Sequence, residues 1–362
     1  MTNERHFFPG SNSANGFYSL FKYILPVDRA NRIFYIKGGP GTGKSYLMKK
    51  IADLFNSEDY TLEYFHCSSD NESLDALNIK DLNIALIDGT SPHMQDPLYP
   101  GALDEIIDFG VSLDKDKLHS HKDEIIKVNK DISSTFKRAF SYLNASKSIH
   151  DNWSYRNKEH VNNMALNALK LELKNMIFKN YTDYSKFVPF NRHLFSTAFT
   201  PNGVISYIDT LYSDCENIYI LKGGPGTGKS EILTYIQTEA LIRGMTIEIL
   251  HHPLIPNKIE HLILPEINTA ILTSNEINNK DFSGLQINTN DLLDNNIDFY
   301  RDSIKQDKEN FHFMLNEALN ILSSCKKLHD DLEEFYINNI DFNIVDDISN
   351  AVIQRILNYK NS

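Results

Sequence analysis

The feature that most constrains the fold is a run of eight residues that occurs twice. Gly-Gly-Pro-Gly-Thr-Gly-Lys-Ser spans residues 38–45 and returns unchanged at residues 223–230. Both copies fit G-x-x-x-x-G-K-[ST], in which backbone N–H groups surround a phosphate, the lysine reaches its outer oxygens and the hydroxyl ligates Mg²⁺. Glycine is required where a Cβ would collide with the phosphate or where φ is positive. The pattern predicts two phosphate-binding loops in a chain that is built twice.

Both copies lie between an apolar run and a helical apolar pattern. Residues 33–36 and 218–221 precede the loops and suit central parallel strands. Leucines and isoleucines then recur at helical spacing after each lysine. A helix placed there directs the positive end of its dipole at the phosphate. On these residues the chain resembles the P-loop NTPases, and the resemblance covers the core of both halves.

This resemblance implies ATP and Mg²⁺ as cofactors and identifies the residues that would hold them. The expected nucleotide-binding residues are Gly38, Gly39, Pro40, Gly41, Thr42, Gly43, Lys44 and Ser45, with Gly223, Gly224, Pro225, Gly226, Thr227, Gly228, Lys229 and Ser230. The expected metal ligands are Ser45, Asp88 and Ser230. Lys44 is expected to stabilise charge on the β- and γ-phosphates.

The halves align without a gap from the loops onward, at an offset of 185 residues (229 − 44). Residues 83–88, Asn-Ile-Ala-Leu-Ile-Asp, end in Asp88 and follow the loop with one intervening strand, at residues 61–66. A carboxylate at that strand end orients Mg²⁺ beside the loop hydroxyl, as in a Walker B motif. The alternative is an aspartate that caps the following turn.

The equivalent position in the second half is Thr273, so its Walker B motif is degenerate. A threonine bonds to a metal-bound water but brings no negative charge. Glu276, slightly beyond it, is a candidate to compensate. We therefore expect two unequal sites, with hydrolysis or transfer in the first half and slow or no turnover in the second.

A loop rich in turn-forming residues follows Asp88 and contains His93 and Asp96. Such a loop lies at the carboxyl edge of the sheet, where open α/β folds bind ligands. His93 and Asp96 are candidate catalytic residues that position water, sense the γ-phosphate or contact an acceptor. The alternative is a rigid connection with solvated side chains.

The lead-in to each loop is also repeated, as Arg5-His6 and Arg192-His193. These residues are expected to form a loop and helix cap shared by descent, or to contact a nucleotide across the boundary between halves. The linker at residues 181–186 is short and polar, so we expect close packing of the halves, as in a fused homodimer.

Long polar helices are predicted late in each half. Apolar residues step by three or four from Ile125 to Leu143, and the same face returns from Ile304 to Leu322. We expect the helices to pack on the core of their own half or to pair with each other as a pseudo-two-fold interface. Two less favoured alternatives are that the helices bind a protein partner and that Arg138 serves as an arginine finger. The predicted domains are residues 1–187 with a helical arm at about 114–178, and 188–362 with an arm at about 294–360.

The amino-acid composition limits which partners and which cellular compartment we expect. A formal charge of −12 over 362 residues argues against a general nucleic-acid or anionic-membrane surface. Cys67, Cys215 and Cys325 are widely separated, which argues against a disulfide framework or zinc site. The polar N-terminus and the absence of a long apolar run indicate no secretion signal or membrane helix, so we expect a cytoplasmic protein.

The expected fold class is α/β, with two tandem P-loop NTPase domains, each a mainly parallel sheet with flanking helices and an appended helical hairpin. Gly89 follows Asp88 where many P-loop ATPases place a catalytic glutamate, and no N-K-x-D guanine motif is found. The single intervening strand favours a nucleotide-kinase branch, while the tandem arrangement resembles a poorly characterised family of bacterial tandem P-loop ATPases. The predicted function is a Mg-dependent ATPase with a weak or regulatory second site; the alternatives are a nucleotide or small-molecule kinase, and a nucleotide-dependent switch acting on a protein partner.

Overall fold

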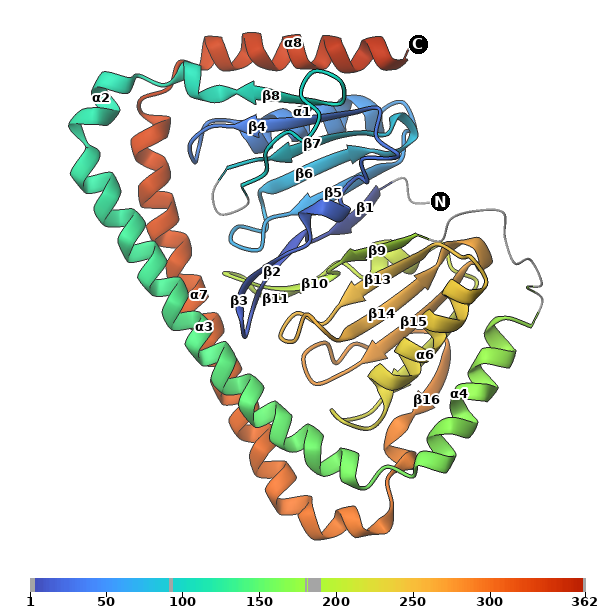
Figure 1. Ribbon diagram of the computed structural model, residues 1–362. Coiled ribbons are helices and arrows are strands. Elements are labelled where there is room, and N and C mark those ends of the chain that lie inside the picture. Colours follow the sequence, from blue (N-terminus) through green and yellow to red (C-terminus); the bar gives the residue numbers. More distant parts are fainter. Residues whose placement is uncertain (1–3, 91–93, 180, 182–189, 361–362) are drawn as a thin grey trace.

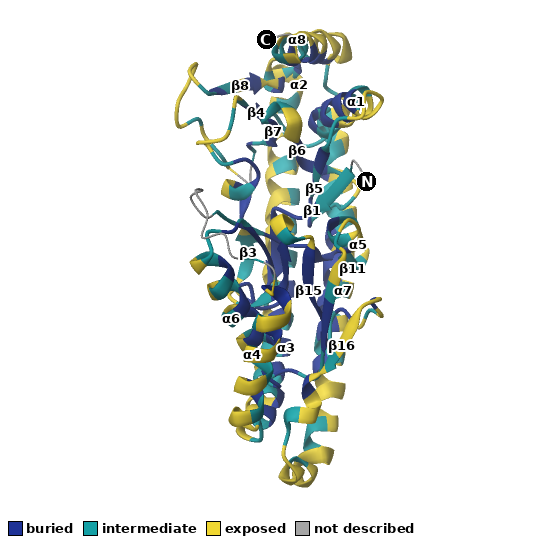
Figure 2. Ribbon diagram, turned by 90° about the vertical axis from the view of Figure 1, so that its right-hand side faces the viewer, coloured by how far each residue is buried: buried dark blue, intermediate teal, exposed yellow. Residues whose placement is uncertain are grey.

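Two mixed β-sheets and a long pair of helices make up the molecule (Figure 1). The computed structural model describes residues 4–90, 94–179, 181 and 190–360. Figure 2, turned by 90°, shows buried strands inside and exposed outer faces on the helices. No helix in the described ranges combines the length and apolar character needed to cross a membrane.

The first half contains a six-stranded sheet, a hairpin and four α-helices. Its strands are β1 (Glu4–Phe7), β2 (Gly10–Ser13), β3 (Gly16–Ser19), β4 (Arg32–Lys37), β5 (Leu62–His66), β6 (Leu74–Ile79), β7 (Ile84–Asp88) and β8 (Asp104–Asp108). Its helices are α1 (Lys44–Asn56), α2 (Lys115–Ser120), α3 (Lys122–Glu159) and α4 (Asn163–Ile177). Short 3₁₀ turns cover Phe21–Tyr23, Lys80–Leu82 and Phe109–Ser112.

The second half repeats this order of elements. Its strands are β9 (Asn191–Leu194), β10 (Thr197–Thr200), β11 (Gly203–Ser206), β12 (Asn217–Lys222), β13 (Ile247–His251), β14 (Ile259–Leu264), β15 (Thr269–Ser274) and β16 (Leu285–Asn288). Its helices are α5 (Asp209–Tyr212), α6 (Lys229–Ile242), α7 (Arg301–Ile337) and α8 (Phe342–Lys360). Short 3₁₀ turns cover Pro265–Ile267, Thr289–Leu292 and Asn295–Tyr300.

The two sheets have equivalent topologies. The first has the strand order β1-β5-β6-β7-β4-β8, and the second has β9-β13-β14-β15-β12-β16 when taken in the same direction. All strands run parallel except β6 and β14, which pair antiparallel with both neighbours. The α/β class and the repeated units agree with the prediction, although each sheet is mixed.

Strand β6 was not predicted, and its presence changes the number of strands between the first loop and Asp88. Because the turn after β5 is short, the chain folds back as a hairpin and β6 lies between β5 and β7. All six residues of β6 are buried. Two strands therefore separate the first loop from Asp88, and the expectation of one intervening strand, which favoured the kinase branch, is wrong.

The halves meet along their edge strands and share one apolar core. Phe7 and Phe65 of the first half belong to the same buried cluster as Leu194 and Leu250 of the second. At the centre of the contact, the N–H of Phe8 donates to the carbonyl of Phe195 at 2.9 Å, and the reverse bond is 3.1 Å. The interface is thus approximately two-fold symmetric.

The repeated Arg-His lead-ins form edge strands and are not loops. Arg5 on β1 donates to Glu248 on β13 at 2.8 Å, and Arg192 on β9 donates twice to Glu63 on β5 at 2.6 Å. Each arginine thus pairs with the glutamate of the opposite half. Glu63 and Glu248 are 1% and 6% exposed, so these charges lie inside the interface.

Helices α3 and α7 form a long antiparallel pair beside both sheets (Figure 1). Ala139 and Leu143 of α3 pack with Phe311, Ala318 and Leu322 of α7 in one buried cluster. Small residues at the contact let the two helices approach closely. Of the two arrangements expected from the apolar stripes, these helices adopt the pairing with each other.

The shorter helix of each arm packs on the core of the opposite half. Leu166 and Leu173 of α4 are buried with Ile232 and Ile236 of α6. Val345 and Ile356 of α8 are buried in the cluster that contains the α1 residues of the first half. The expectation that an arm packs on its own core is wrong for these helices. Helix α3 runs from the first sheet to the second and α7 runs in the opposite direction, so α4 and α8 each begin beside the sheet of the other half.

Candidate functional site

The first loop, residues 38–45, connects β4 to α1. Gly41 and Gly43 have φ values of 68° and 90°, in the left-handed region that disfavours other residues. The Lys44 ammonium folds back on the loop and donates to the carbonyls of Gly38 at 3.2 Å and Gly39 at 2.7 Å. Because α1 begins at Lys44, its free N–H groups face this loop and favour an anion there.

Asp88 lies at the end of β7, the strand paired in parallel with β4. Its Oδ2 is 3.6 Å from the Nζ of Lys44, whereas its Oδ1 accepts hydrogen bonds from the backbone and hydroxyl of Thr90 at 2.9 and 2.5 Å. The structure therefore brings Asp88 to Lys44, and the turn after β7 fixes the carboxylate. Asp88 thus lies beside the loop and also caps the turn that follows β7, which is the alternative role.

Ser45 faces the start of β6. Its hydroxyl accepts a hydrogen bond from the N–H of Leu74 at 3.0 Å. The next residue, Asp75, is 4% exposed, and its equivalent in the second half at the offset of 185 is Glu260, which is 1% exposed. Sequence reasoning missed this acidic pair, although the gap-free alignment of the halves places a carboxylate at both positions.

The other two catalytic candidates are not brought to Lys44. Asp96 pairs with Lys37 at 3.0 Å, and its side chain is 84% exposed. The same lysine donates to the carbonyls of Gly89 and Gln95, both at 2.7 Å, which ties the loop to the end of β4. His93 lies outside the described residues.

The second loop, residues 223–230, repeats the first. Gly226 and Gly228 have φ values of 79° and 100°. Lys229 donates to the carbonyls of Gly223 and Gly224, the latter at 2.6 Å. Burial lowers the pKa of Lys229 to about 8, an effect larger than the opposing influence of Glu276.

Thr273 occupies the position of Asp88 but is tied into a polar network. Its N–H donates to His261 at 3.0 Å, and its hydroxyl accepts from Asn275 at 3.3 Å. Asn275 also donates to Glu260 at 3.0 Å. Burial raises the pKa of Glu260 to about 8. The second half therefore keeps a carboxylate near its loop, but on β14 and not at the end of β15.

A cavity of about 220 Å³ lies against the second loop. The loop contributes Gly226, Lys229 and Ser230, and the sheet contributes Glu260 and Thr273. Helix α3 of the first half lines the opposite side with His150, Ser154 and Lys158. A larger space of about 610 Å³ adjoins the same loop and is lined by Gly224, Glu276 and Arg301, among others.

Each loop is covered by the arm of the opposite half. Asn157 of α3 donates to the carbonyl of Pro225 at 2.7 Å, and a Cβ on Gly226 would overlap the backbone of Ser154. On the first loop, a Cβ on Gly39 would lie 2.5 Å from the ring of Tyr336 on α7. Asn157 and Tyr336 are equivalent at the arm offset of 179 (336 − 157). The loop glycines thus allow a helix to approach closely from the other half.

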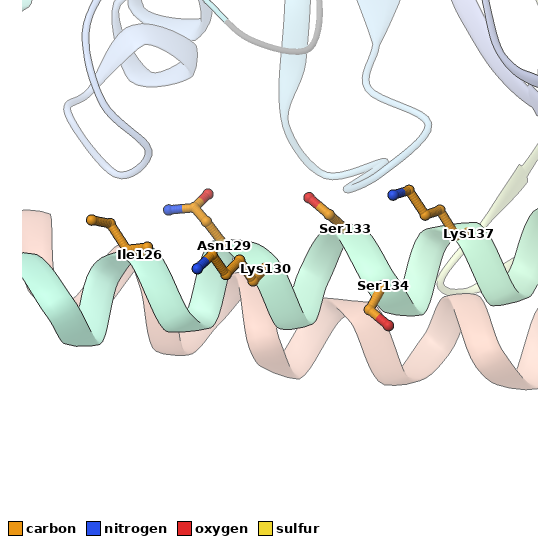
Figure 3. Close-up of a pocket in the computed structure, with 6 residues that line it drawn as sticks. All are labelled: Ile126, Asn129, Lys130, Ser133, Ser134 and Lys137. Atoms are coloured by element: carbon orange, nitrogen blue, oxygen red, sulfur yellow. The ribbon is translucent and has the colours of Figure 1, made fainter.

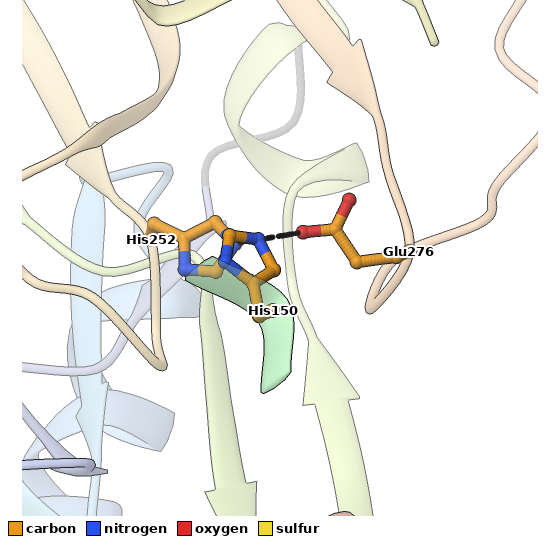
Figure 4. A group of neighbouring side chains, drawn as sticks. All are labelled: His150, His252 and Glu276. Atoms are coloured by element: carbon orange, nitrogen blue, oxygen red, sulfur yellow. Dashed lines mark hydrogen bonds and ion pairs between the residues drawn. The ribbon is translucent and has the colours of Figure 1, made fainter. Parts of the chain in front are cut away.

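Three polar side chains meet beside the second loop (Figure 4). His150 comes from α3, His252 follows β13, and Glu276 follows β15. His150 donates from Nε2 to Oε1 of Glu276 at 2.7 Å, and Nε2 of His252 lies 3.7 Å from the same oxygen. Burial favours the neutral carboxyl, but the bonds from the two imidazoles outweigh it and hold the pKa of Glu276 well below its usual range.

The exposed side of α3 carries a shallow groove of about 420 Å³ (Figure 3). It is lined by Ile126, Asn129, Lys130, Ser133, Ser134 and Lys137, all of them on this helix. The guanidinium of the neighbouring Arg138 stacks over Tyr142 of the same helix, 5.9 Å from the ring centre. These residues are in the N-terminal half of α3, whereas the contacts with the second loop come from its last turns.

Comparison with known proteins gives one partial similarity. A family model described as Nephrocystin 3, N-terminal, matches residues 19–146. The matched segment includes the first loop, strands β4 to β8 and the first part of α3, and it ends before the second half. No curated protein and no solved structure matches the chain significantly. Over that segment the chain is similar to the N-terminal region of nephrocystin 3.

Proposed function

We propose that the protein is a tandem P-loop ATPase that binds Mg-ATP at residues 38–45 and hydrolyses it there. The observation that carries this proposal is the approach of Asp88, at the end of β7, to Lys44, at the start of α1, with 3.6 Å between Oδ2 and Nζ. Backbone N–H groups, an ammonium and a metal-orienting carboxylate are the parts that phosphoryl transfer requires.

In this proposal the fold supplies binding and electrostatic stabilisation. Lys44, which donates to the carbonyls of Gly38 and Gly39, would instead donate to the γ-phosphate. Ser45 and Asp88 would hold Mg²⁺, which would neutralise charge on the β- and γ-phosphates. Thr90, which donates twice to Asp88, fixes the carboxylate oxygen that does not face Lys44.

The second loop binds a nucleotide but turns it over slowly or not at all. It has the same glycines, lysine and serine as the first loop, yet Thr273 replaces the carboxylate at the strand end. Its role is regulatory, because a nucleotide bound there changes the position of helix α3, which covers the loop.

The test is phosphate release from Mg-ATP, with bound nucleotide counted on the same samples. We expect Asp88→Asn to reduce turnover about 10²-fold or more while two nucleotides still bind, because it removes the charge that orients Mg²⁺. The matched control is Asp108→Asn at the end of β8, the strand that pairs with the other edge of β4. Asp108 accepts a hydrogen bond from the N–H of Gly110, and an asparagine oxygen can accept the same bond. Equal turnover in wild type and Asp88→Asn would contradict the proposal.

A nucleotide-dependent switch is the second candidate, and the covered loops favour it. Tyr336 and Ile337 of α7 lie over the first loop, and Asn157 of α3 bonds to the second. Nucleotide entry would then displace an arm whose outer face is open to a protein partner. Tight binding of two nucleotides without turnover in the wild type would select this function, and product analysis showing transfer to an acceptor would select a kinase.

A further inference from the structure

The second half lacks a carboxylate at the end of β15 but presents one three residues later. Resting on the proposed function, we infer that Glu276 replaces the missing Walker B carboxylate and, together with Ser230, holds the Mg²⁺ of the nucleotide at the second loop. Both residues line the cavity of about 220 Å³ that also contains Lys229 and Thr273.

The two oxygens of Glu276 have different environments. Oε1 faces the imidazoles of His150 and His252, at 2.7 and 3.7 Å. Oε2 is buried and has no hydrogen-bond partner among the described residues, while the side chain is only 4% exposed. A buried carboxylate oxygen without a donor is costly, and a divalent cation satisfies it.

The backbone at Glu276 is held by its neighbour. Asn275 accepts hydrogen bonds from the N–H groups of Ile277 and Asn278 at 2.9 and 2.7 Å, and it is itself 7% exposed. This turn follows β15 directly and directs the next side chain toward the loop. The carboxylate is therefore positioned before any ligand arrives, as a metal site requires.

His150 acts as a positioning residue from the opposite half. Its imidazole is 2% exposed, and it reaches Glu276 from α3 at the part of the helix that lies against the second loop. The equivalent residue of α7 is His329, at the arm offset of 179, and it faces Glu333 of its own helix at 3.7 Å. At this position of the arms, therefore, only the histidine of α3 contacts a carboxylate of the opposite half among the described residues.

The chemistry of the histidines favours Mg²⁺ over a transition metal held by all three side chains. Ligand atoms of His150, His252 and Glu276 lie within 4.8 Å of one another. However, Nδ1 of His252 accepts the N–H of Ile255 at 3.2 Å, so the neutral ring carries its proton on Nε2, the atom that faces Glu276. A metal on Nε2 would require that backbone bond to break, whereas Oε2 of Glu276 and the hydroxyl of Ser230 are oxygen ligands of the kind Mg²⁺ prefers.

The experiment counts Mn²⁺, a paramagnetic substitute for Mg²⁺, by electron paramagnetic resonance in the presence of ADP. The full chain with Lys44→Ala isolates the second site. We expect one Mn²⁺ per nucleotide bound there, and a loss of Mn²⁺ affinity of about tenfold or more when Glu276→Gln is added. The matched control is Glu231→Gln, which lines the same cavity but is 48% exposed and faces Lys170 at 3.5 Å.

The arm contributes a second readout. His150→Ala is expected to weaken Mn²⁺ binding while ADP still binds, and His150→Gln, which keeps an N–H donor, is expected to restore part of it. His329→Ala is the matched variant on α7 and is expected to leave the Mn²⁺ affinity of the second site unchanged. If Glu276→Gln fails to fold, Glu276→Asp tests the same point, because the shorter side chain keeps the charge but displaces the carboxylate.

The outcomes separate this inference from the proposed function. Failure of the wild-type chain to bind any nucleotide would contradict the proposed function. Nucleotide binding with unchanged Mn²⁺ affinity in Glu276→Gln would overturn the inference alone. Tight binding of Zn²⁺ without nucleotide, lost in His150→Ala and His252→Ala, would also overturn it and would identify a transition-metal centre instead.

Discussion

At the scale of single residues, the most consequential charges outside the loops are the four at the interface between the halves. Arg5 and Arg192 face Glu63 and Glu248 in a largely buried region. Burial raises the pKa of Glu63, but the charge and hydrogen bonds of Arg192 and the charge of Arg5 outweigh it and bring the pKa to about 2. The pKa of Glu248 is lowered in the same way, mainly by Arg5.

These depressed pKa values predict acid sensitivity. A carboxyl whose folded pKa lies below its unfolded value of 4.5 contributes stability above pH 4.5 and loses it as the pH falls toward 2. We expect the free energy of unfolding to drop by a few kcal/mol over this range, measured by urea denaturation at several pH values. Glu63→Gln is expected to cost about 3–5 kcal/mol at pH 7, because it leaves Arg192 buried without its partner charge.

The control for this prediction is Glu266→Gln, an exposed glutamate on the surface of the second half. It is expected to leave the acid profile unchanged. A Glu63→Gln variant as stable as the wild type at pH 7, with the same acid midpoint, would contradict the argument.

Single residues were predictable where a local rule fixes them. The loop motif and the strand-end position of Asp88 indicated that Lys44 and Asp88 lie together, and they are 3.6 Å apart. Asp96 was predicted near the same site but is exposed and pairs with Lys37. A position close to Asp88 in the sequence does not determine the direction in which the loop leaves the sheet. His150 had no local signal at all: its partner Glu276 is 126 residues away, in the other half.

At the scale of elements, the helix that covers the second loop carries a natural probe. Trp153 is the chain's one tryptophan and is 7% exposed. Its ring lies 3.5 Å from the position that a Cβ would take on Gly224. Any movement of α3 over this loop therefore changes the surroundings of the indole.

We expect addition of Mg-ADP to shift the emission maximum or intensity of Trp153 in fluorescence titrations. Lys229→Ala is expected to abolish the change, because it removes the lysine that we propose contacts the phosphates at the second loop, and Lys44→Ala is expected to preserve it. A change that follows Lys44 and ignores Lys229 would contradict the assignment of α3 to the second loop.

The elements themselves were largely predictable, but their partners were not. The apolar stripes at residues 125–143 and 304–322 indicated helices in these places, although the helices extend further, over Lys122–Glu159 and Arg301–Ile337. An apolar stripe indicates that one face of a helix is buried but does not indicate which element covers it. The cores of the two halves are so similar that the sequence does not show on which core each helix packs. The exchange of α4 and α8 follows from the direction of the α3–α7 pair, which is a property of the assembled molecule.

At the scale of the whole molecule, the halves depend on each other for their cores. Val345 and Ile356 of α8 complete the cluster around α1, and Leu166 and Leu173 of α4 complete the cluster around α6. A third cluster joins Phe7 and Phe65 to Leu194 and Leu250 across the boundary. Neither half encloses its apolar surface when it is alone.

We therefore expect one cooperative unfolding transition for the complete chain, with calorimetric and van't Hoff enthalpies that agree. Residues 1–181 expressed alone are expected to aggregate, because the α1 side of the sheet is uncovered, and to become soluble when residues 190–362 are produced in the same cell. Two well-separated transitions in scanning calorimetry, or a soluble and folded isolated half, would contradict this expectation.

The crossing of the arms also fixes the order in which the molecule can be completed during synthesis. Strand β4 and helix α1 leave the ribosome early, but α8, which closes their core, is made after the second sheet and α7. The core of the first half therefore stays partly open for most of translation. Apolar surface around β4 and α1 therefore stays exposed on the nascent chain until α8 is made, and the first loop acquires its cover only when α7 and α8 have emerged.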